Sequence, residues 1–272
     1  MSKMLNSTAF SHLKTRHFEH YRIEEFGLAM KRRLVNFIIL LMIISQLSVT
    51  IYLPSLPAMA SYFKVDALHI QLSLTLYLLG YGLSQFFYGP LSDIFGRRWI
   101  ILIGLGIFVL ASLIATLATE VHIFIMARIL QGVGIGCGDT MGRAILCDRF
   151  KNQEFVQAAC RIGLAATLTP MLAPILGGYF ETWFDWRFNL LFILAYGLMS
   201  LILVFWFLPE TKPQENFSVV TLRGILNTYK FILSNRVFLG FFIPGLISFV
   251  GETLYSMMSP FIIQGQLGLS PV

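Results

Sequence analysis

The sequence predicts an all-α polytopic membrane protein, and three observations lead to this fold class. Of its 272 residues, 56% are hydrophobic and only 12% are charged, about half the charged fraction of average soluble proteins. Its mean hydropathy is +0.73. Several apolar stretches reach the length of about 20 residues that a helix needs to cross a bilayer. This composition argues against a soluble fold and excludes a disordered chain.

Seven apolar stretches are expected to be membrane-spanning helices. Glycine and proline recur inside them, and in a membrane these residues allow close helix contacts and kinks. Residues 34–208 are expected to form a six-helix transmembrane bundle, and residues 237–272 carry the seventh span and begin a second bundle. The predicted spans are residues 34–54, 69–91, 99–118, 121–146, 156–180, 187–208 and 237–263.

Two polar segments flank the predicted bundle. Residues 1–33 are basic and end in Lys31-Arg32-Arg33 beside the membrane, where such a segment favours the anionic headgroups of the lipid bilayer. Residues 209–236 form the longest internal connection, a cytoplasmic linker. Its second half, from Leu222 to Leu233, has apolar residues at helical spacing and is expected to lie along the interface.

Lysine and arginine residues predict the orientation in the membrane. With a cytoplasmic N-terminus, sixteen of the twenty lie on the cytoplasmic side, and only Lys64 and Arg187 on the other. These short basic clusters belong to membrane topology, so no nucleic acid partner is expected. The cysteines show no metal or redox spacing and are expected to be packing thiols on the reducing side: Cys137, Cys147 and Cys160.

The segment after the second span reads Gly89-Pro90-Leu91-Ser92-Asp93-Ile94-Phe95-Gly96-Arg97-Arg98. It resembles the G-x-L-x-D-x-x-G-R-R signature of the major facilitator superfamily. Its glycines are expected to permit a tight turn and close helix approach, and its arginines to hold the cytoplasmic side. We expect Arg97 to bridge Asp93 and Asp148, which ties this loop to the fourth span and favours one state of a gate.

Further motifs resemble the bicyclomycin and chloramphenicol resistance branch of drug:proton antiporters in that family. They are Arg128-Ile129-Leu130-Gln131-Gly132, Gly142-Arg143-Ala144-Ile145-Leu146-Cys147-Asp148 and the antiporter motif Pro170-Met171-Leu172-Ala173-Pro174-Ile175-Leu176-Gly177-Gly178. The resemblance covers about residues 34–271. It implies a secondary active transporter of the bacterial inner membrane, which exports drugs or other small molecules in exchange for protons by alternating access, without a cofactor. In this reading the bend of the fifth span shapes a central cavity.

The chain departs from that branch at two positions. Thr50 stands where the branch places an acidic residue near the end of span 1, and Cys147 stands where it usually has arginine. Proton coupling is therefore expected to depend on Glu252, near the middle of span 7, or on a residue beyond Val272. A solvated carboxylate on a cavity wall stays open as the alternative for Glu252.

Other polar residues lie at membrane depth. Asp139 and Arg143 are four residues apart and share a helix face. They are candidates for substrate binding or coupling, and a structural ion pair between them is the interpretation that the spacing favours. Arg128 either faces a partner inside the protein or extends toward the outer interface. With Gln46, Thr50 and Glu252, it is expected to mark a substrate path between spans 1, 4, 5 and 7. Such a path, lined by aromatic and Met side chains with few charges, suits neutral or weakly cationic amphipathic drugs.

The length of the chain leaves alternatives open. The family has two six-helix halves with the substrate between them, so about five spans would follow Val272. Either the chain is a fragment or truncated product, or something else completes it, and a transport-incompetent remnant is the alternative function. A seven-span receptor is opposed by the cytoplasmic N-terminus and the signature after span 2. A membrane-embedded enzyme is opposed because no Ser/His/Asp set, metal-spaced histidines or phosphate loop occurs in the sequence.

Overall fold

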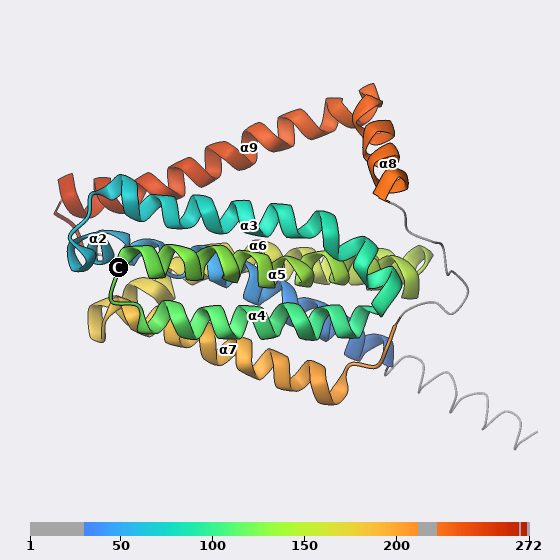
Figure 1. Cartoon of the computed structure of the whole chain (residues 1–272), viewed down its shortest axis with the longest axis horizontal. Helices are drawn as coiled ribbons and strands as arrows, with labels where there is room; N and C mark the ends of the chain where they lie inside the picture. The colour runs from blue at the N-terminus through green and yellow to red at the C-terminus, as the bar shows by residue number, and fades with distance from the viewer. Residues whose placement is uncertain (1–29, 212–221, 267, 271–272) are drawn as a thin grey trace, which may run out of the picture.

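The computed structural model describes residues 30–211, 222–266 and 268–270, which form long helices and contain no strand (Figure 1). Most of the basic N-terminal segment and linker residues 212–221 lie outside the described residues. The predicted all-α polytopic fold is confirmed. Six described helices are long and apolar enough to cross a membrane: Met30–Phe63, Arg97–Leu117, Val121–Arg149, Asn152–Trp183, Trp186–Phe207 and Arg236–Gly265.

The first span is broken near the end that the charges predict to be external. Residues 30–50 are helical, and after a turn the chain continues as η1 (Leu53–Ser55) and α2 (Leu56–Phe63). Proline lacks the N–H that a continuing helix needs, but it is well tolerated in the first turn of a new one. Pro54 and Pro57 occupy such first-turn positions in η1 and α2. The two prolines therefore explain why the straight helix ends close to the predicted residue 54.

Three helices form the centre of the bundle: α3 (Ala67–Phe95), α4 (Arg97–Leu117) and α5 (Val121–Arg149). α3 and α4 pack on opposite sides of α5 (Figure 1). α3 has 29 residues and is long enough to span a bilayer, although it is not among the six helices named above. Asp66 caps α3 by accepting a hydrogen bond from the backbone N–H of His69 at 2.9 Å. This bond and the His69 ring hold the pKa of Asp66 below its ordinary value.

The signature segment is mostly helical, so its prediction as a loop is wrong. α3 continues to Phe95 and α4 starts at Arg97, which leaves Gly96 as the sole residue between them. Gly96 has a φ of 93°, a value that side chains with a β-carbon rarely adopt, so the expected tight turn lies here. Gly89 instead lies inside α3 with open space beside its Cα, so it makes neither a turn nor a close contact.

The remaining helices are α6 (Asn152–Trp183), α7 (Trp186–Phe207), α8 (Leu222–Ser234) and α9 (Arg236–Pro260), and α9 continues into the π-helical η2 (Phe261–Gln266). α8 is helical, as the apolar spacing in the linker predicts. α9 lies at the edge of the bundle and diverges from α3 toward α8 (Figure 1). It meets the bundle at the predicted external end, where Gln71 donates a hydrogen bond to the Met257 carbonyl at 3.2 Å.

The interior is apolar and continuous from the first helix to α7. Fully buried residues include Leu41, Tyr77, Phe108 and Ile193, which come from four different helices. Large apolar side chains also cover much of the outer surface, as expected where lipid replaces water. Among the cysteines, Cys137 is buried, whereas Cys147 and Cys160 are exposed. The packing interpretation is thus right for Cys137 and wrong for the other two.

Candidate functional site

Arg128 lies inside the bundle and is fully buried. Its Nη1 donates to Oε1 of Gln131 at 2.7 Å, and its Nη2 donates to the carbonyl oxygen of Ser48 at 3.0 Å. The guanidinium carbon lies 4.2 Å from the ring centroid of Tyr52 and 4.3 Å from that of Tyr77. The charged end therefore has its partners within the protein, and the alternative that it extends to the outer interface is wrong.

No carboxylate forms an ion pair with Arg128 in the described part of the chain. Two aromatic faces and two oxygens surround the charge instead, a set of cation–π and hydrogen-bonding partners. Gln131 extends this set by donating from Nε2 to the Ser112 hydroxyl of α4 at 2.8 Å. A buried cation is costly unless such partners are in place, so these contacts fix one orientation of Arg128.

Asp139 lies 11 residues further along α5 and is only 3% exposed. Its Oδ2 accepts hydrogen bonds from the hydroxyl of Tyr81 and from that of Ser45, the latter at 3.3 Å. The predicted ion pair with Arg143 is wrong, because Arg143 is exposed and makes no ion pair in the described part of the chain.

An aromatic pair links these two buried charged residues. The rings of Tyr77, beside Arg128, and Tyr81, beside Asp139, are nearly parallel, with centroids 6.5 Å apart. The polar contacts thus continue through the bundle from α5 to α3 and the first helix. We call this set the inner polar chain: Ser45, Tyr52, Tyr77, Tyr81, Arg128, Gln131 and Asp139.

A second polar group gathers at the predicted cytoplasmic end. Arg97 is 7% exposed and forms an ion pair with Asp148 near the end of α5, so this part of the predicted bridge is confirmed. Asp93 is exposed and forms no ion pair with Arg97 in the described structure, so the other part is wrong. Arg98 donates from Nη2 to the carbonyl of Phe205 in α7 at 2.7 Å.

Glu210, expected only to be part of the linker, caps α4. Its Oε1 accepts from the backbone N–H of Arg97 at 3.0 Å, and its Oε2 from that of Arg98 at 3.3 Å. Gly96, at the N-cap position, has no side chain to satisfy these groups, and a carboxylate also suits the positive end of the helix dipole. The sequence does contain a signal for this role of Glu210. An acidic residue directly follows a span, and it lies on the same side of the membrane as a helix start whose N-cap residue, Gly96, has no side chain. We call Gly96, Arg97, Arg98, Asp148 and Glu210 the signature cluster.

Glu210→Ala is expected to lower the free energy of unfolding by about 1–2 kcal/mol, because it leaves helix-start N–H groups without an acceptor. Reversible unfolding in detergent micelles would measure the change. Glu154→Ala is a matched control, since Glu154 pairs with Lys31 at 2.6 Å on the surface and such pairs contribute only about 0–1 kcal/mol. A loss for Glu210→Ala no larger than for Glu154→Ala would contradict the capping role.

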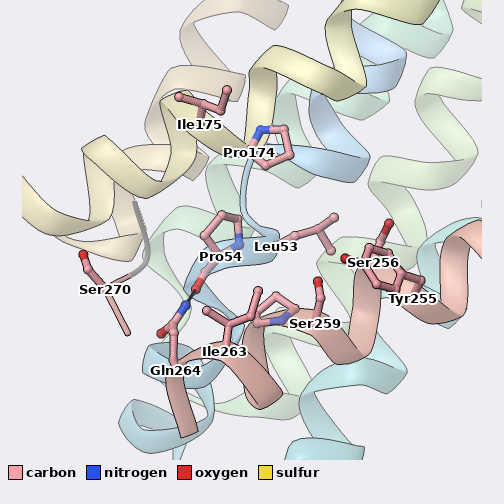
Figure 2. Close-up of a pocket in the computed structure, with 11 residues that line it drawn as sticks. Leu53, Pro54, Pro174, Ile175, Tyr255, Ser256, Ser259, Ile263, Gln264 and Ser270 are labelled. Atoms are coloured by element: carbon pink, nitrogen blue, oxygen red, sulfur yellow. Dashed lines mark hydrogen bonds between the residues drawn. The ribbon is translucent and has the colours of Figure 1, made fainter. Parts of the chain in front are cut away.

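A cavity of about 330 Å³ lies at the predicted external end, between η1, α6 and α9 (Figure 2). Gln264 donates from Nε2 to the carbonyl of Pro54 at 2.7 Å and so connects the two sides (Figure 2). The lining is mostly apolar, with a few hydroxyls, one amide and no charged side chain: Leu53, Pro54, Pro174, Ile175, Tyr255, Ser256, Ser259, Pro260, Ile263, Gln264 and Ser270.

The other predicted path residues do not line this cavity. Gln46 and Thr50 are half-buried, and the Thr50 hydroxyl donates to the Gln46 carbonyl of its own helix at 2.8 Å. Glu252 is exposed on α9 and has no hydrogen bond or ion pair that the described structure shows. Pro170 is half-buried one turn before Pro174. Residues of the predicted spans 1, 5 and 7 therefore line the cavity, as expected for the substrate path. The polar residues of span 4 do not line it and lie in the interior of the bundle instead.

α6 approaches the first span closely at Gly177, which is buried together with Gly178. A β-carbon at Gly177 would collide with the carbonyl oxygen of Ile51. The Gly177 carbonyl also accepts a hydrogen bond from Nδ2 of Asn189 in α7 at 3.2 Å. The close helix contact expected of small residues in this motif is therefore present.

The family of the chain follows from its similarity to known proteins. Residues 38–272 match the Major Facilitator Superfamily. The chain belongs to this family. The signature segment, Arg128 with Gln131, and the Pro170–Gly178 stretch of α6 are the motifs on which the sequence resemblance rests, and they lie in one bundle.

Several proteins that are similar to this chain in sequence are named for drug resistance. Multidrug resistance protein D of Escherichia coli (strain K12) is 32% identical over 245 residues, which are 89% of this chain and 61% of the relative. A bicyclomycin resistance protein homolog of Haemophilus influenzae is 33% identical, covering 79% and 55% of the two chains. Chloramphenicol resistance protein CraA of Acinetobacter baumannii is 27% identical, covering 80% and 52%. The expected resemblance is confirmed, and the chain spans little more than half the length of these relatives.

Solved major facilitator structures share the fold. A bacterial homolog of the human lysosomal transporter Spinster, inward-facing and unoccupied, has a TM-score of 0.69 at 14% identity, over 89% of this chain and 57% of its own. The human organic anion transporter MFSD10 has a TM-score of 0.60 at 21% identity, over 72% and 53%. At these identities the similarity concerns the fold alone.

Proposed function

We propose that the protein is a secondary active transporter of the bacterial inner membrane, with a cytoplasmic N-terminus, that exports drugs or other small molecules in exchange for protons by alternating access. Membership of the major facilitator family supports transport rather than catalysis. The relatives named for multidrug, bicyclomycin and chloramphenicol resistance support the substrate class. The proposal concerns the whole protein, because this chain spans little more than half of those relatives.

The observation that carries the proposal is the uncharged lining of the cavity at the predicted external end. An apolar wall with a few hydroxyl and amide groups binds the apolar surface of a ligand and orients it through a few hydrogen bonds. Phosphorylated metabolites instead require several cationic or N–H donors, and none of the residues that line this cavity is charged. Neutral or weakly cationic amphipathic molecules are therefore the substrates we propose.

The signature cluster supports a gate at the predicted cytoplasmic end. It joins the start of α4 to the end of α5 through Arg97 and Asp148, and to the segment after α7 through Glu210. Contacts that form in one arrangement of the helices and break in another shift the balance between the two states. We assign the ion pair to the state in which these helix ends are held together.

Drug accumulation in cells tests the proposal. Escherichia coli cells depleted of their own exporters would express either this chain or the full-length multidrug resistance protein D, and take up a fluorescent hydrophobic cation. We expect export that a protonophore abolishes, with competition from hydrophobic drugs and none from sugar phosphates. Competition from sugar phosphates alone would contradict the substrate class. Accumulation equal to the empty vector, beside an active relative, would support the transport-incompetent alternative for this chain.

A further inference from the structure

Asp139 is the one buried carboxylate in the described part of the chain. It lies ten residues before Arg149 at the end of α5, which places it roughly 15 Å from that end at the rise of a helix. A bilayer core is about 30 Å thick, so this depth corresponds to the membrane interior. Ionisable side chains at such depth are expensive and usually serve a function.

The surroundings of Asp139 suit a neutral acid. Oδ2 accepts from Tyr81 and Ser45, whereas Oδ1 is buried and has no hydrogen-bond partner among the residues that the structure describes. No cation pairs with the carboxyl group within the described residues. A carboxylate without a counter-ion in a medium of low polarity is strongly disfavoured against its protonated form. Oδ1 is therefore the oxygen left to carry a proton.

The neighbouring helices add few titratable groups. α3 contributes Tyr77 and Tyr81, and α5 itself contributes Cys137 and Arg143. The first helix contributes the Ser45 hydroxyl. In the described structure no charged side chain of α4 or α6 interacts with Asp139. Arg143 is thus the nearby cation, and it is exposed in this arrangement.

We propose that Asp139 binds and releases the proton that drives transport, with Arg143 as the counter-charge of the deprotonated state. This inference rests on the proposed function. Residues four apart on a helix lie on one face, so the Arg143 side chain can turn inward and reach the carboxylate. The Oδ1–H bond then breaks, the proton passes to water, and the guanidinium compensates the negative charge. We assign the present arrangement, in which Arg143 is exposed, to the protonated state.

Glu252 has a weaker structural basis for this role. It is exposed on α9, and the described residues offer it no donor, no cation and no hydrophobic enclosure. The contacts of Asp139 with two other helices, by contrast, connect its protonation to their relative position.

Infrared spectroscopy tests proton binding without requiring transport. The purified chain in lipid vesicles would be scanned over pH for the carbonyl band of a protonated carboxyl group. We expect a band that titrates in the wild type, is lost in Asp139→Asn and persists in Glu252→Gln. Tyr81→Phe is expected to shift its midpoint. Tyr88→Phe is the matched control on the same helix, because that hydroxyl donates to the Val133 carbonyl at 2.8 Å, and it should leave the midpoint unchanged.

The outcomes separate this inference from the proposed function. Loss of the band in Glu252→Gln, its persistence in Asp139→Asn, or its removal by sodium ions at constant pH would overturn the assignment to a proton on Asp139. Asp139→Glu retains a carboxyl group and should retain a titrating band, which controls for misfolding of the asparagine variant. Absence of drug export by the whole protein, together with an Asp139 band, would contradict the proposed function and leave the proton site standing.

Discussion

Arg128→Lys is expected to reduce transport by the whole protein at least about tenfold, the equivalent of about 1.4 kcal/mol. Lysine keeps the charge, but it lacks the planar fork that donates at once to Gln131 and Ser48, and it stacks less well between Tyr52 and Tyr77. A buried cation with fewer partners also lowers the free energy of unfolding, by about 1–3 kcal/mol. Export from cells and unfolding in detergent would measure the two effects.

Arg161→Lys is the matched control for this substitution. Arg161 is exposed on α6 and makes no ion pair within the described residues, so the same exchange there should leave export within about twofold of wild type and stability within about 0.5 kcal/mol. If Arg128→Lys behaves like Arg161→Lys in both measurements, the buried arginine acts as a generic positive charge, and the geometric role assigned to its contacts is wrong.

The helices could be predicted from sequence because each span is a local property of its own residues. The apolar run 99–118, for example, differs by only one or two residues from α4. Arg97 and Asp148 were paired correctly because they belong to two motifs with a family resemblance. The predicted pairing of Asp139 with Arg143 was wrong because helical spacing shows only which groups share a face. It cannot show that a tyrosine 58 residues away and a serine 94 residues away occupy the carboxylate first.

Long-range contacts also explain why neither the capping role of Glu210 nor the cavity could be predicted from the sequence. Glu210 lies more than 110 residues after the start of the helix it caps, so no local pattern connects the two. The cavity depends on where the outer end of α9 meets η1 and α6, which is a matter of tertiary packing rather than of composition. Thr50 and Gln46 were predicted to face a path because they are polar, but the Thr50 hydroxyl is satisfied by its own helix. The polarity of a residue alone therefore does not show whether its side chain lines a cavity or forms a hydrogen bond within its own helix.

Gly177→Ala is expected to lower the free energy of unfolding by about 2–3 kcal/mol, at the upper end for overpacked sites. The added methyl group would meet the backbone carbonyl of Ile51, and a backbone atom cannot move aside as a side chain does. α6 must therefore shift away from the first span, which also weakens the hydrogen bond from Asn189 and displaces the cavity wall at Pro174. Unfolding in detergent micelles and drug binding to the purified protein would report the two consequences.

Gly163→Ala is the matched control, because it makes the same chemical change on the same helix but is not expected to lower the free energy of unfolding. Apart from its own stretch of helix, no atom of the described residues lies within 4 Å of where a β-carbon would stand at Gly163. Alanine there keeps only its advantage in helix propensity, about 0.5–1 kcal/mol. Gly177→Ala should thus destabilise while Gly163→Ala is neutral or stabilising. Equal effects at both positions would mean that α6 does not pack against Ile51 in the membrane. The antiporter motif would then act through Pro170 and Pro174 alone, because the loss of backbone N–H groups at these prolines requires no close contact with the first span.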